Sequence, residues 1–458
     1  MGALIILFLT AIICLFVSLY ASKNNIIVIS IIGCIAAAIS VIMTLQEPNS
    51  IFRDMMIFDH YTAGFTLLMV VIAILVFLIS DYGFRTLYDT VGDNVALILF
   101  SMCGAICMVS FNNLIMLFLG IEILSIPLYV LAGSKRDNIY SNEAALKYFL
   151  MGSFATGFLL MGIALLYGYT GSIDVPTMQA ALISKGLAGY GLVGFILVCI
   201  AMFFKISAAP FHFWSPDVYQ GSPTTITLFM STIVKIAAFG LFGRLMMSMF
   251  AAFESQWVVM FSAIAALTML IGNLGALGQS NLKRMLAYSS VAHAGYLILG
   301  LVAINNNSVS AMYYYLAAYS FASVIAFGIF LLVSEQVGTE DIKGFNGLAK
   351  RKPFLAACMT IALLSMTGIP PLAGFIGKYF LFIKAMEINP ALIIVAVINS
   401  AISVAYYFRP IIAMYFEEKD DVDNEIVTKP TVQFAILLAL LGMMLMMVMP
   451  QFFQNIVI

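Results

Sequence analysis

Residues 199–214, CIAMFFKISAAPFHFW, place Lys205 inside a long apolar run, five residues before a proline that interrupts the run. Lys235 (LFMSTIVKIAAFGLF) and Lys378 (PPLAGFIGKYFLF) lie in similar surroundings. A charge in hydrocarbon is costly, so a lysine within a membrane-spanning segment is a functional-site hypothesis by default. Because burial opposes the charged form, such a lysine can take up and release a proton near neutral pH. These three lysines therefore predict a membrane protein that translocates protons.

The composition excludes a soluble globular protein. Of the 458 residues, 63% are hydrophobic and 9% are charged, whereas a soluble domain carries about 25% charged residues. Apolar runs of roughly 17–25 residues match membrane-spanning helices rather than barrel strands. The net charge of −1 gives no electrostatic basis for nucleic-acid binding. The first residues, MGALIILFLTAIICLF, have no basic region and no cleavage site, so we expect a retained first helix rather than a signal peptide.

We therefore predict an all-α polytopic membrane protein with about fourteen transmembrane helices. Helices seven and twelve are expected to be broken, because proline lacks the N–H group that continues a helix. The breaks fall at Ala209-Pro210 and at Gly368-Ile369-Pro370-Pro371. The spans are expected near residues 3–21, 26–45, 61–80, 95–110, 113–132, 144–168, 188–208, 224–249, 257–278, 285–304, 309–334, 354–386, 391–413 and 432–453.

The order of features repeats once along the chain. Asn113 matches Asn281 at a spacing of 168 residues, and the break at Pro210 matches the break at Pro370 at a spacing of 160. Five spans separate the two copies, so the second copy enters the membrane from the opposite side, as in transporters with inverted repeats. The predicted units are three N-terminal helices (1–93), a first five-helix repeat (94–250), a second, inverted five-helix repeat (251–415) and a C-terminal helix (416–458).

Basic residues are concentrated in alternate loops. With the N-terminus outside, the inside loops hold thirteen Lys and Arg residues, and the outside loops and helix ends hold four. The positive-inside rule then puts both termini on the outer, periplasmic face of a bacterial inner membrane. The inside set is Lys23, Arg85, Lys135, Arg136, Lys283, Arg284, Lys343, Lys350, Arg351, Lys352, Arg409, Lys419 and Lys429, and the outside set is Arg53, Lys185, Arg244 and Lys384.

One acidic residue also lies inside an apolar run. Glu122 lies in LIMLFLGIEILSIPLYVL, where Pro127 frees the carbonyl group of Ile123. A carboxylate with apolar neighbours on both sides needs a cationic partner, and we predict that Glu122 pairs with Lys205. Tightening the pair would load a proton on Lys205, and separating it would let the proton move on. The alternative is a static ion pair that fixes helix packing.

The other buried lysines are candidate proton stations. Lys235 has Ser231 one turn away, and Lys378 follows the double-proline break with glycines close by. Lys147 also fits no loop, but it has Glu143 four residues before it, the favourable orientation for a surface pair. A proton station and a lysine that reaches to the interface therefore both stay open for Lys147.

Two histidines complete the candidate site. His212 follows the break in helix seven, and His293 lies in AYSSVAHAGYLI. Histidine titrates near neutrality and can pass protons between waters. Simple hydrogen-bonded packing is the alternative for both.

The sequence contains no motif for a metal or a cofactor. All six cysteines lie inside apolar runs. Cys103 and Cys107 are one helical turn apart, and we favour packing over a ligand pair. There is no CxxC, no cluster of Cys and His, and no glycine-rich nucleotide loop. We therefore expect no metal and no cofactor on this chain, and any linked redox chemistry on another chain.

Five stretches resemble the antiporter-like subunits of respiratory complex I. They are FLGIEILSIPLYVLAG, FKISAAPFHFWSPDVYQGSP, STIVKIAAFG, SNLKRMLAYSSVAHAGY and GIPPLAGFIGKYF, and the similarity runs through spans four to thirteen. WSPDVYQGSP is most similar to the subunit N members of NADH–quinone oxidoreductase. The sister subunits and the Mrp-type cation/proton antiporters have a different tail after WxPD.

The resemblance implies fourteen helices, two inverted five-helix bundles and a proton-translocating role in the membrane arm. It also implies partner subunits that carry flavin, iron–sulfur clusters and quinone, and contacts with neighbouring antiporter-like and small hydrophobic subunits in the lipid bilayer. An Mrp-type antiporter subunit and a purely structural role are the alternatives. Carried over by motif, Glu122 and Lys205 correspond to the family's ion pair, Lys235 to the central relay, Lys378 to the terminal station, and Lys147, His212 and His293 to positions on the polar axis.

Overall fold

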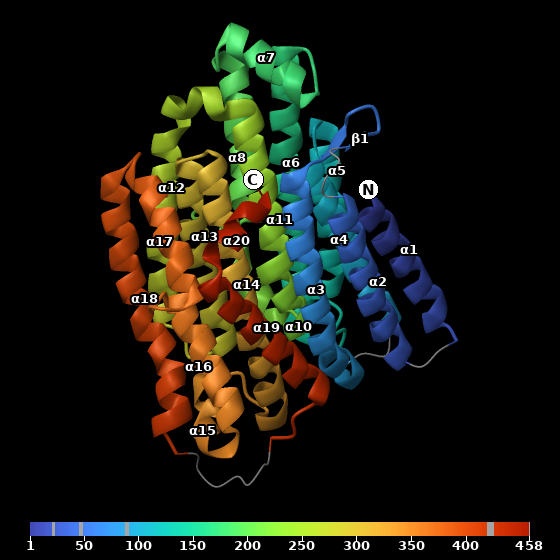
Figure 1. The fold of residues 1–458 in the computed structure, drawn as a ribbon, viewed down its shortest axis with the longest axis vertical. Coiled ribbons are helices and arrows are strands. Elements are labelled where there is room, and N and C mark those ends of the chain that lie inside the picture. The colour runs from blue at the N-terminus through green and yellow to red at the C-terminus, as the bar shows by residue number, and fades with distance from the viewer. Residues whose placement is uncertain (21–22, 45–48, 88–90, 419–425, 458) are drawn as a thin grey trace.

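The computed structural model describes residues 1–458 except 21–22, 45–48, 88–90, 419–425 and 458. The described residues form a bundle of long helices that run roughly along the long axis of the molecule (Figure 1). The predicted all-α polytopic architecture is confirmed. Of the predicted inside set of basic residues, Lys419 and the side chains of Lys23 and Arg85 lie outside the described residues.

Helix boundaries follow the predicted spans because polar caps and prolines delimit the apolar runs. The Asn113 side chain accepts a hydrogen bond at the start of α5, and Asn305 forms a capping box at the start of α14. The helices are α1 (Gly2–Ser18), α2 (Lys23–Thr44), α3 (His60–Leu87), α4 (Val91–Ser110), α5 (Leu114–Ala132), α6 (Ile139–Thr170), α7 (Val175–Lys185), α8 (Gly189–Lys205), α9 (Trp214–Gly221), α10 (Thr224–Phe229), α11 (Lys235–Leu245), α12 (Glu254–Leu277), α13 (Leu282–Val302), α14 (Asn306–Val337), α15 (Leu348–Arg351), α16 (Pro353–Thr367), α17 (Ala373–Met386), α18 (Pro390–Phe416), α19 (Pro430–Val448) and α20 (Pro450–Gln454).

The described residues supply enough helices for the predicted spans. Ten stretches are long and apolar enough to cross a membrane, and α1, α8 and α16 are shorter apolar helices. One of the ten stretches, Thr224–Leu277, contains α10 and α11 and then, after a short 3₁₀ helix at Ala251–Phe253, α12. Counting that stretch as two spans, and α17 as the continuation of α16, gives the fourteen that we predicted.

The two helix breaks occur where the prolines predicted them. α8 ends at Lys205 and the chain resumes as α9 after a cis peptide bond before Pro210. α16 ends at Thr367 and resumes as α17 after a cis bond before Pro371. Each break therefore leaves helix ends, with free backbone groups, inside the bundle.

The structure repeats contacts at the predicted spacing. Asn113 forms an isolated antiparallel bridge with Asp174, and Asn281 forms the same bridge with Asp341. The helix that follows the first bridge, α7, lies at the top of Figure 1, whereas α15, which follows the second, lies at the bottom. These paired contacts at opposite ends have the geometry that an inverted repeat requires. Both chain ends lie in the upper half of the same view.

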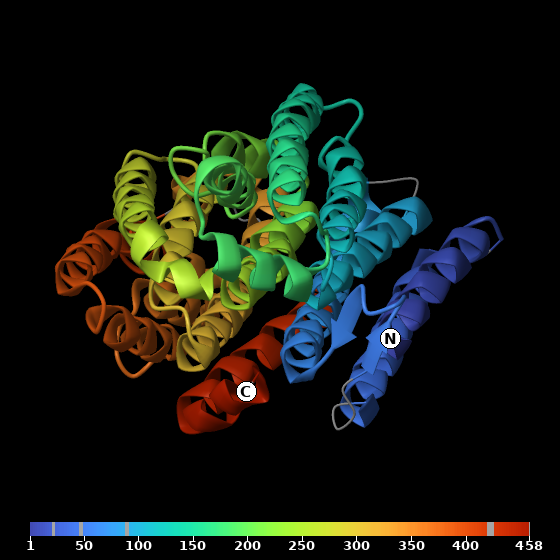
Figure 2. The same ribbon diagram turned by 90° about the horizontal axis from the view of Figure 1, so that it is seen from above.

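Glycines allow the closest helix pairs to form. A Cβ atom on Gly104 of α4 would lie 2.3 Å from the backbone nitrogen of Leu124 in α5. A Cβ atom on Gly272 of α12 would lie 2.4 Å from the backbone nitrogen of Ala292 in α13. Such small residues let helix backbones approach each other in membranes. In Figure 2, α1 and α2 lie at one edge of the bundle. α19, near the C-terminal end of the chain, packs on α3, near its N-terminal end.

Four local features have no counterpart in the predicted spans. A short hairpin joins strands β1 (Asn49–Ile51) and β2 (Met56–Phe58), and α7 lies between α6 and α8. The residues before Lys235, Met230–Val234, form a π-helical turn, η1. A second π-helical turn, η2, covers Met246–Phe250. Such turns inside helices are frequent at functional sites, and Lys235 follows η1 directly.

Candidate functional site

Lys205 is the last residue of α8 and lies at the first helix break. It is 6% exposed, and its Nζ donates a hydrogen bond to Ser125 Oγ of α5 at 2.8 Å. The break itself is held by Trp214, whose Nε1 donates to the carbonyl oxygen of Phe204 at 3.0 Å. Ser207, within the break, adopts the left-handed conformation with a φ of 58°. The broken helix thus presents a buried ammonium group to a hydroxyl group of the neighbouring helix.

Glu122 lies one helical turn from Ser125 but faces a different helix. It is half-buried on α5, and its Oε1 accepts a hydrogen bond from Thr156 Oγ1 of α6 at 2.7 Å. The direct ion pair predicted between Glu122 and Lys205 is not formed within 4.0 Å in this structure. Each charged group instead has a hydroxyl partner of its own, Ser125 for Lys205 and Thr156 for Glu122. The two groups therefore occupy adjacent positions without touching.

Lys235 begins α11 directly after the π-helical turn. It is 2% exposed, its Nζ donates to the backbone carbonyl oxygen of Ser290 in α13, and it lies 5.4 Å from the centre of the Tyr319 ring. A carbonyl oxygen and a ring face stabilise a cation without neutralising it. Lys235 therefore sits in the interior with polar contacts and no carboxylate within ion-pair distance among the described residues.

His293 lies farther along α13, three residues after Ser290. Its Nδ1 is 2.6 Å from the Tyr315 hydroxyl, and its Nε2 is 3.0 Å from the Tyr407 hydroxyl. Tyr407 in turn lies 2.6 Å from Ser289 Oγ. Both ring nitrogens are therefore engaged by hydroxyl groups that can donate or accept, which is the arrangement that a proton relay needs.

Lys378 lies on α17, after the second break. It is 3% exposed, and its Nζ donates to the carbonyl oxygen of Thr367, the last residue of α16, at 2.7 Å and to Ser400 Oγ at 3.0 Å. The same Nζ is 4.5 Å from the centre of the Tyr296 ring. A helix carboxyl end attracts a cation because its last carbonyl groups are unpaired. The break predicted from the prolines thus provides the site of the lysine.

The second half of the candidate site is a line of buried polar side chains. α13 carries Ser290, His293 and Tyr296 along one face, with Lys235 at one end and Lys378 at the other. The ring of His293 lies 6.2 Å from that of Tyr296. Of the predicted residues, the structure brings Lys235, His293 and Lys378 together on this axis.

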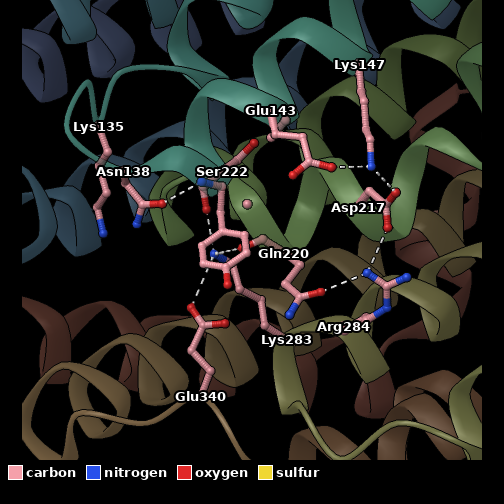
Figure 3. A pocket seen from close by; sticks show the side chains of 13 residues that line it. Lys135, Asn138, Glu143, Lys147, Asp217, Gln220, Ser222, Lys283, Arg284 and Glu340 are labelled. Atoms are coloured by element: carbon pink, nitrogen blue, oxygen red, sulfur yellow. Dashed lines mark hydrogen bonds and ion pairs between the residues drawn. The ribbon is translucent and has the colours of Figure 1, made fainter.

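Lys147 belongs to a separate, open pocket of about 520 Å³ at one end of the bundle (Figure 3). Its Nζ contacts Glu143 at 2.6 Å, as predicted from their spacing, and also Asp217 of α9 at 2.7 Å. Asp217 additionally binds Arg284 of α13 at 2.8 Å. Burial opposes the charged carboxylate, but the hydrogen bonds from Lys147 and Arg284 outweigh burial and hold the pKa of Asp217 below its usual value.

Two of the loop predictions are wrong in this pocket. Lys283 and Arg284, predicted in an inside loop, lie in the first turn of α13, and Lys283 is only 2% exposed. α9 folds back over this turn after the break, so the carbonyl oxygens of Gln220 and Ser222 cover the ammonium group. The signal for Asp217 and Lys283 was present in the motifs WSPDVYQGSP and SNLKRML. Only the fold brings the two motifs together.

His212 lies in the break that follows α8 and is buried. Its Nδ1 has no hydrogen-bond partner among the described residues, and its ring packs on Phe213. The structure therefore does not join His212 to the chain of Lys235, His293 and Lys378.

The cysteines and acidic residues form no evident metal site. All six cysteines are free and buried. Within the described ranges, no group of three or more His, Cys, Asp or Glu side chains is arranged to hold a metal ion.

Most of this chain matches a known protein family. Residues 111–403 match the family model for NADH:quinone oxidoreductase/Mrp antiporter transmembrane proteins. NADH-quinone oxidoreductase subunit N of Cytophaga hutchinsonii is 42% identical over 405 residues, covering 88% of this chain and 87% of that protein. The Flavobacterium johnsoniae subunit N is 40% identical, and the match covers 97% of this chain and 96% of that protein. This chain belongs to the subunit N family.

Solved structures agree with the family assignment. A chain of respiratory complex I from Thermus thermophilus with bound aureothin is 30% identical to this chain, covers 99% of it with 98% of its own length, and has a TM-score of 0.84. A chain of the Mrp complex from Dietzia has a TM-score of 0.88 and is 18% identical to this chain. The match covers 100% of this chain and 96% of that one. The second likeness shows the common fold alone.

Proposed function

We propose that this chain is a proton-translocating membrane-arm subunit of NADH–quinone oxidoreductase. The observation that carries the proposal is the buried polar chain from Lys235 through His293 to Lys378. Membrane interiors tolerate such a chain only where it serves transport or is fully paired. Subunit N relatives at about 40% identity over most of the chain support the same function.

The proposed mechanism assigns one step to each group. Lys205 and Glu122 form a switch whose closure stabilises a proton on Lys205 and whose opening releases it. The proton then reaches Lys235, passes along the hydroxyl groups and imidazole around His293, and arrives at Lys378. Lys235 contacts the carbonyl oxygen of Ser290, and the two ring nitrogens of His293 contact the hydroxyl groups of Tyr315 and Tyr407. Lys147 and His212 are proposed to serve the approach to this axis.

Electron transfer is assigned to other chains. NADH oxidation and quinone reduction, with the flavin and the iron–sulfur clusters, are proposed to take place on partner subunits, and no redox site is proposed here. The partners would be neighbouring antiporter-like and small hydrophobic subunits. Glu122 is half-buried on α5, with exposed apolar residues such as Ile123 and Ile126 beside it, a surface suited to a neighbouring membrane helix.

The membrane placement follows from the charges. We propose a multi-pass protein of the bacterial inner membrane with both termini on the periplasmic face, because the basic loops then lie inside. The units 1–93, 94–250, 251–415 and 416–458 are proposed as the N-terminal three helices, the two inverted repeats and the C-terminal helix. The paired bridges Asn113–Asp174 and Asn281–Asp341 support this division.

The test begins with the intact complex. The chain is tagged, the complex is extracted in mild detergent, and the co-purifying subunits and NADH:quinone activity are measured. Flavin and iron–sulfur partners with that activity are expected. Lys235→Ala should then abolish NADH-driven proton pumping in membrane vesicles without loss of assembly. Hydrophobic partners alone, with Na⁺ or K⁺ exchange in vesicles, would instead establish an antiporter, and loss of assembly alone in the lysine variants would indicate a structural role.

A further inference from the structure

Helix α18 supplies two of the groups that contact the axis of Lys235, His293 and Lys378. Ser400 Oγ accepts a hydrogen bond from Lys378 Nζ at 3.0 Å, and the Tyr407 hydroxyl lies 3.0 Å from His293 Nε2. Yet α18 lies at the edge of the bundle, on the opposite side from α1 (Figure 1), and many of its apolar side chains are exposed. Apolar contacts give membrane helices little drive to associate, because lipid tails are equally apolar. Polar contacts are therefore needed to hold α18 in register.

The inward face of α18 carries a stripe of polar residues. Its members recur at the spacing of one helix face and are Asn399, Ser400, Ser403, Tyr406 and Tyr407. All except Ser400 are at most 2% exposed. Buried polar groups are costly unless they are hydrogen-bonded, so the partners of this stripe decide how α18 sits against its neighbours.

One residue of α12, the helix that packs beside α18, binds two members of the stripe. Asn273 is fully buried. Its Nδ2 donates to Asn399 Oδ1 at 3.3 Å, and its Oδ1 accepts from the Tyr406 hydroxyl at 3.0 Å. Because Asn399 and Tyr406 are two helical turns apart, a single carboxamide group spans two turns of α18. It thereby fixes both the rotation and the height of α18 relative to α12.

Each of the two carboxamide groups is held in one orientation. Asn273 Nδ2 also donates to the Met269 carbonyl oxygen at 2.8 Å, and Asn399 Nδ2 donates to the Val395 carbonyl oxygen at 2.9 Å. Turning either amide over would place its own oxygen against a carbonyl oxygen, where neither atom can donate. A carboxamide is not a titratable side chain. The pair therefore sets positions and carries no proton.

The two residues that Asn273 binds are next to the two groups that contact the axis. Asn399 directly precedes Ser400, and Tyr406 directly precedes Tyr407. A rotation or slide of α18 that broke the Asn273 contacts would therefore also displace Ser400 and Tyr407 from the axis.

We propose that Asn273 is a positioning residue for the Lys378 end of the axis. Through its two partners it fixes α18. That helix then keeps Ser400 in contact with Lys378, and it keeps the Tyr407 hydroxyl in contact with His293. The inference rests on the proposed function and adds to it a residue that does not itself carry a proton.

The test compares variants of the intact complex in membrane vesicles. Asn273→Leu keeps the approximate size of the side chain and removes both contacts with α18. Tyr406→Phe removes one of them, and Ser400→Ala removes a group that Asn273 is proposed to position. Tyr313→Phe is the matched control, because Tyr313 is also buried but its hydroxyl donates to the carbonyl oxygen of Gly64 in α3. NADH-driven proton pumping is measured, and assembly is measured by co-purification of partner subunits.

Asn273→Leu should assemble and lower pumping by at least about tenfold, because misplacing a group by about 1 Å can cost up to about 100-fold. Tyr406→Phe should lower pumping by roughly three- to tenfold, the effect of one hydrogen bond. Tyr313→Phe should stay within about 1.5-fold of the wild type, since its hydroxyl lies outside the network.

The combination of Asn273→Leu with Ser400→Ala separates positioning from general packing. If Asn273 acts through Ser400, the double variant should lose at least about twofold less than the product of the two single losses, because only sites without a shared partner multiply. If Asn273→Leu fails to assemble, Tyr406→Phe takes its place in this comparison.

Three results would overturn the inference while Lys235→Ala is inactive, and they leave the proposed function standing. They are full pumping by assembled Asn273→Leu, full pumping by Ser400→Ala, and single losses that multiply in the double variant. Full pumping by Lys235→Ala would overturn the proposed function and this inference together.

Discussion

The contact between Lys205 and Ser125 gives the sharpest test of the proposed switch. In Ser125→Ala, the Lys205 ammonium group loses the hydroxyl that accepts its hydrogen bond at 2.8 Å. Both side chains are buried, so bulk water does not readily replace the lost partner. A hydrogen bond to a charged group contributes about 1.5–3 kcal/mol. At 1.36 kcal/mol per tenfold, the protonated form of Lys205 becomes roughly 10- to 150-fold less populated relative to the neutral form.

The expected result is a loss of turnover in an assembled complex. If loading of Lys205 limits the cycle, NADH-driven pumping in vesicles should fall by at least about tenfold, the lower end of that range. Ser125→Thr keeps the hydroxyl and should retain most of the activity.

Ser110→Ala is the matched control for this variant. Ser110 is equally buried, but its hydroxyl donates only to carbonyl oxygens of its own helix, to Ile106 at 2.8 Å and to Cys107 at 3.4 Å. This control should pump within about twofold of the wild type, because the lost hydroxyl contacts only its own helix and none of the charged groups. Full pumping by Ser125→Ala, with the control unchanged, would refute the idea that the Ser125 hydroxyl helps to load Lys205.

Three further outcomes are expected. Gly104→Ala puts a Cβ atom 2.3 Å from the Leu124 nitrogen and should lower the stability of the complex by about 1–3 kcal/mol. Gly157→Ala in α6, with nothing within 4 Å, should not lower the unfolding temperature, because alanine favours a helix interior over glycine. The pKa of Asp217 lies below the usual value of 3.8, so its charge stabilises the fold at neutral pH and this contribution is lost as pH falls through the folded-state pKa. Asp217→Asn should therefore unfold at a lower temperature than the wild type at pH 7, and a difference in unfolding temperature that failed to narrow in acid would contradict this. Lys350→Ala removes an ion pair whose side chains are 72% and 83% exposed and should change stability by less than about 1 kcal/mol in the same melting assay.

Helices and breaks were predictable because they depend on local sequence. Each apolar run is long enough to span a membrane, and proline removes an N–H group wherever it occurs. The breaks after Lys205 and before Lys378 were located from Pro210 and Pro370 for this reason. The π-helical turn before Lys235 was not found, because MSTIV contains neither proline nor glycine to mark it.

The partners of the charged groups were less predictable because they depend on tertiary contacts. The sequence indicated that Glu122 needs a cation, yet Thr156 and Ser125 separate it from Lys205 in the structure. Counting charges by loop put Lys283 outside the membrane helices, and only the fold of α9 over α13 buries it. A hydroxyl group leaves a weak signal in a sequence, since serine and threonine are common in any helix.

The arrangement of Glu122 and Lys205 suits a switch better than a permanent pair would. Each charged group holds a neutral hydroxyl, and the two hydroxyls could be exchanged for a direct ion pair by a shift of about one helical turn on α5. One hydrogen bond to a charge is worth about 1.5–3 kcal/mol. Moving one proton against 100 mV costs about 2.3 kcal/mol. Because the two energies match, an exchange of partners at Glu122 and Lys205 is large enough to drive one proton step and small enough to be reversed in the next cycle.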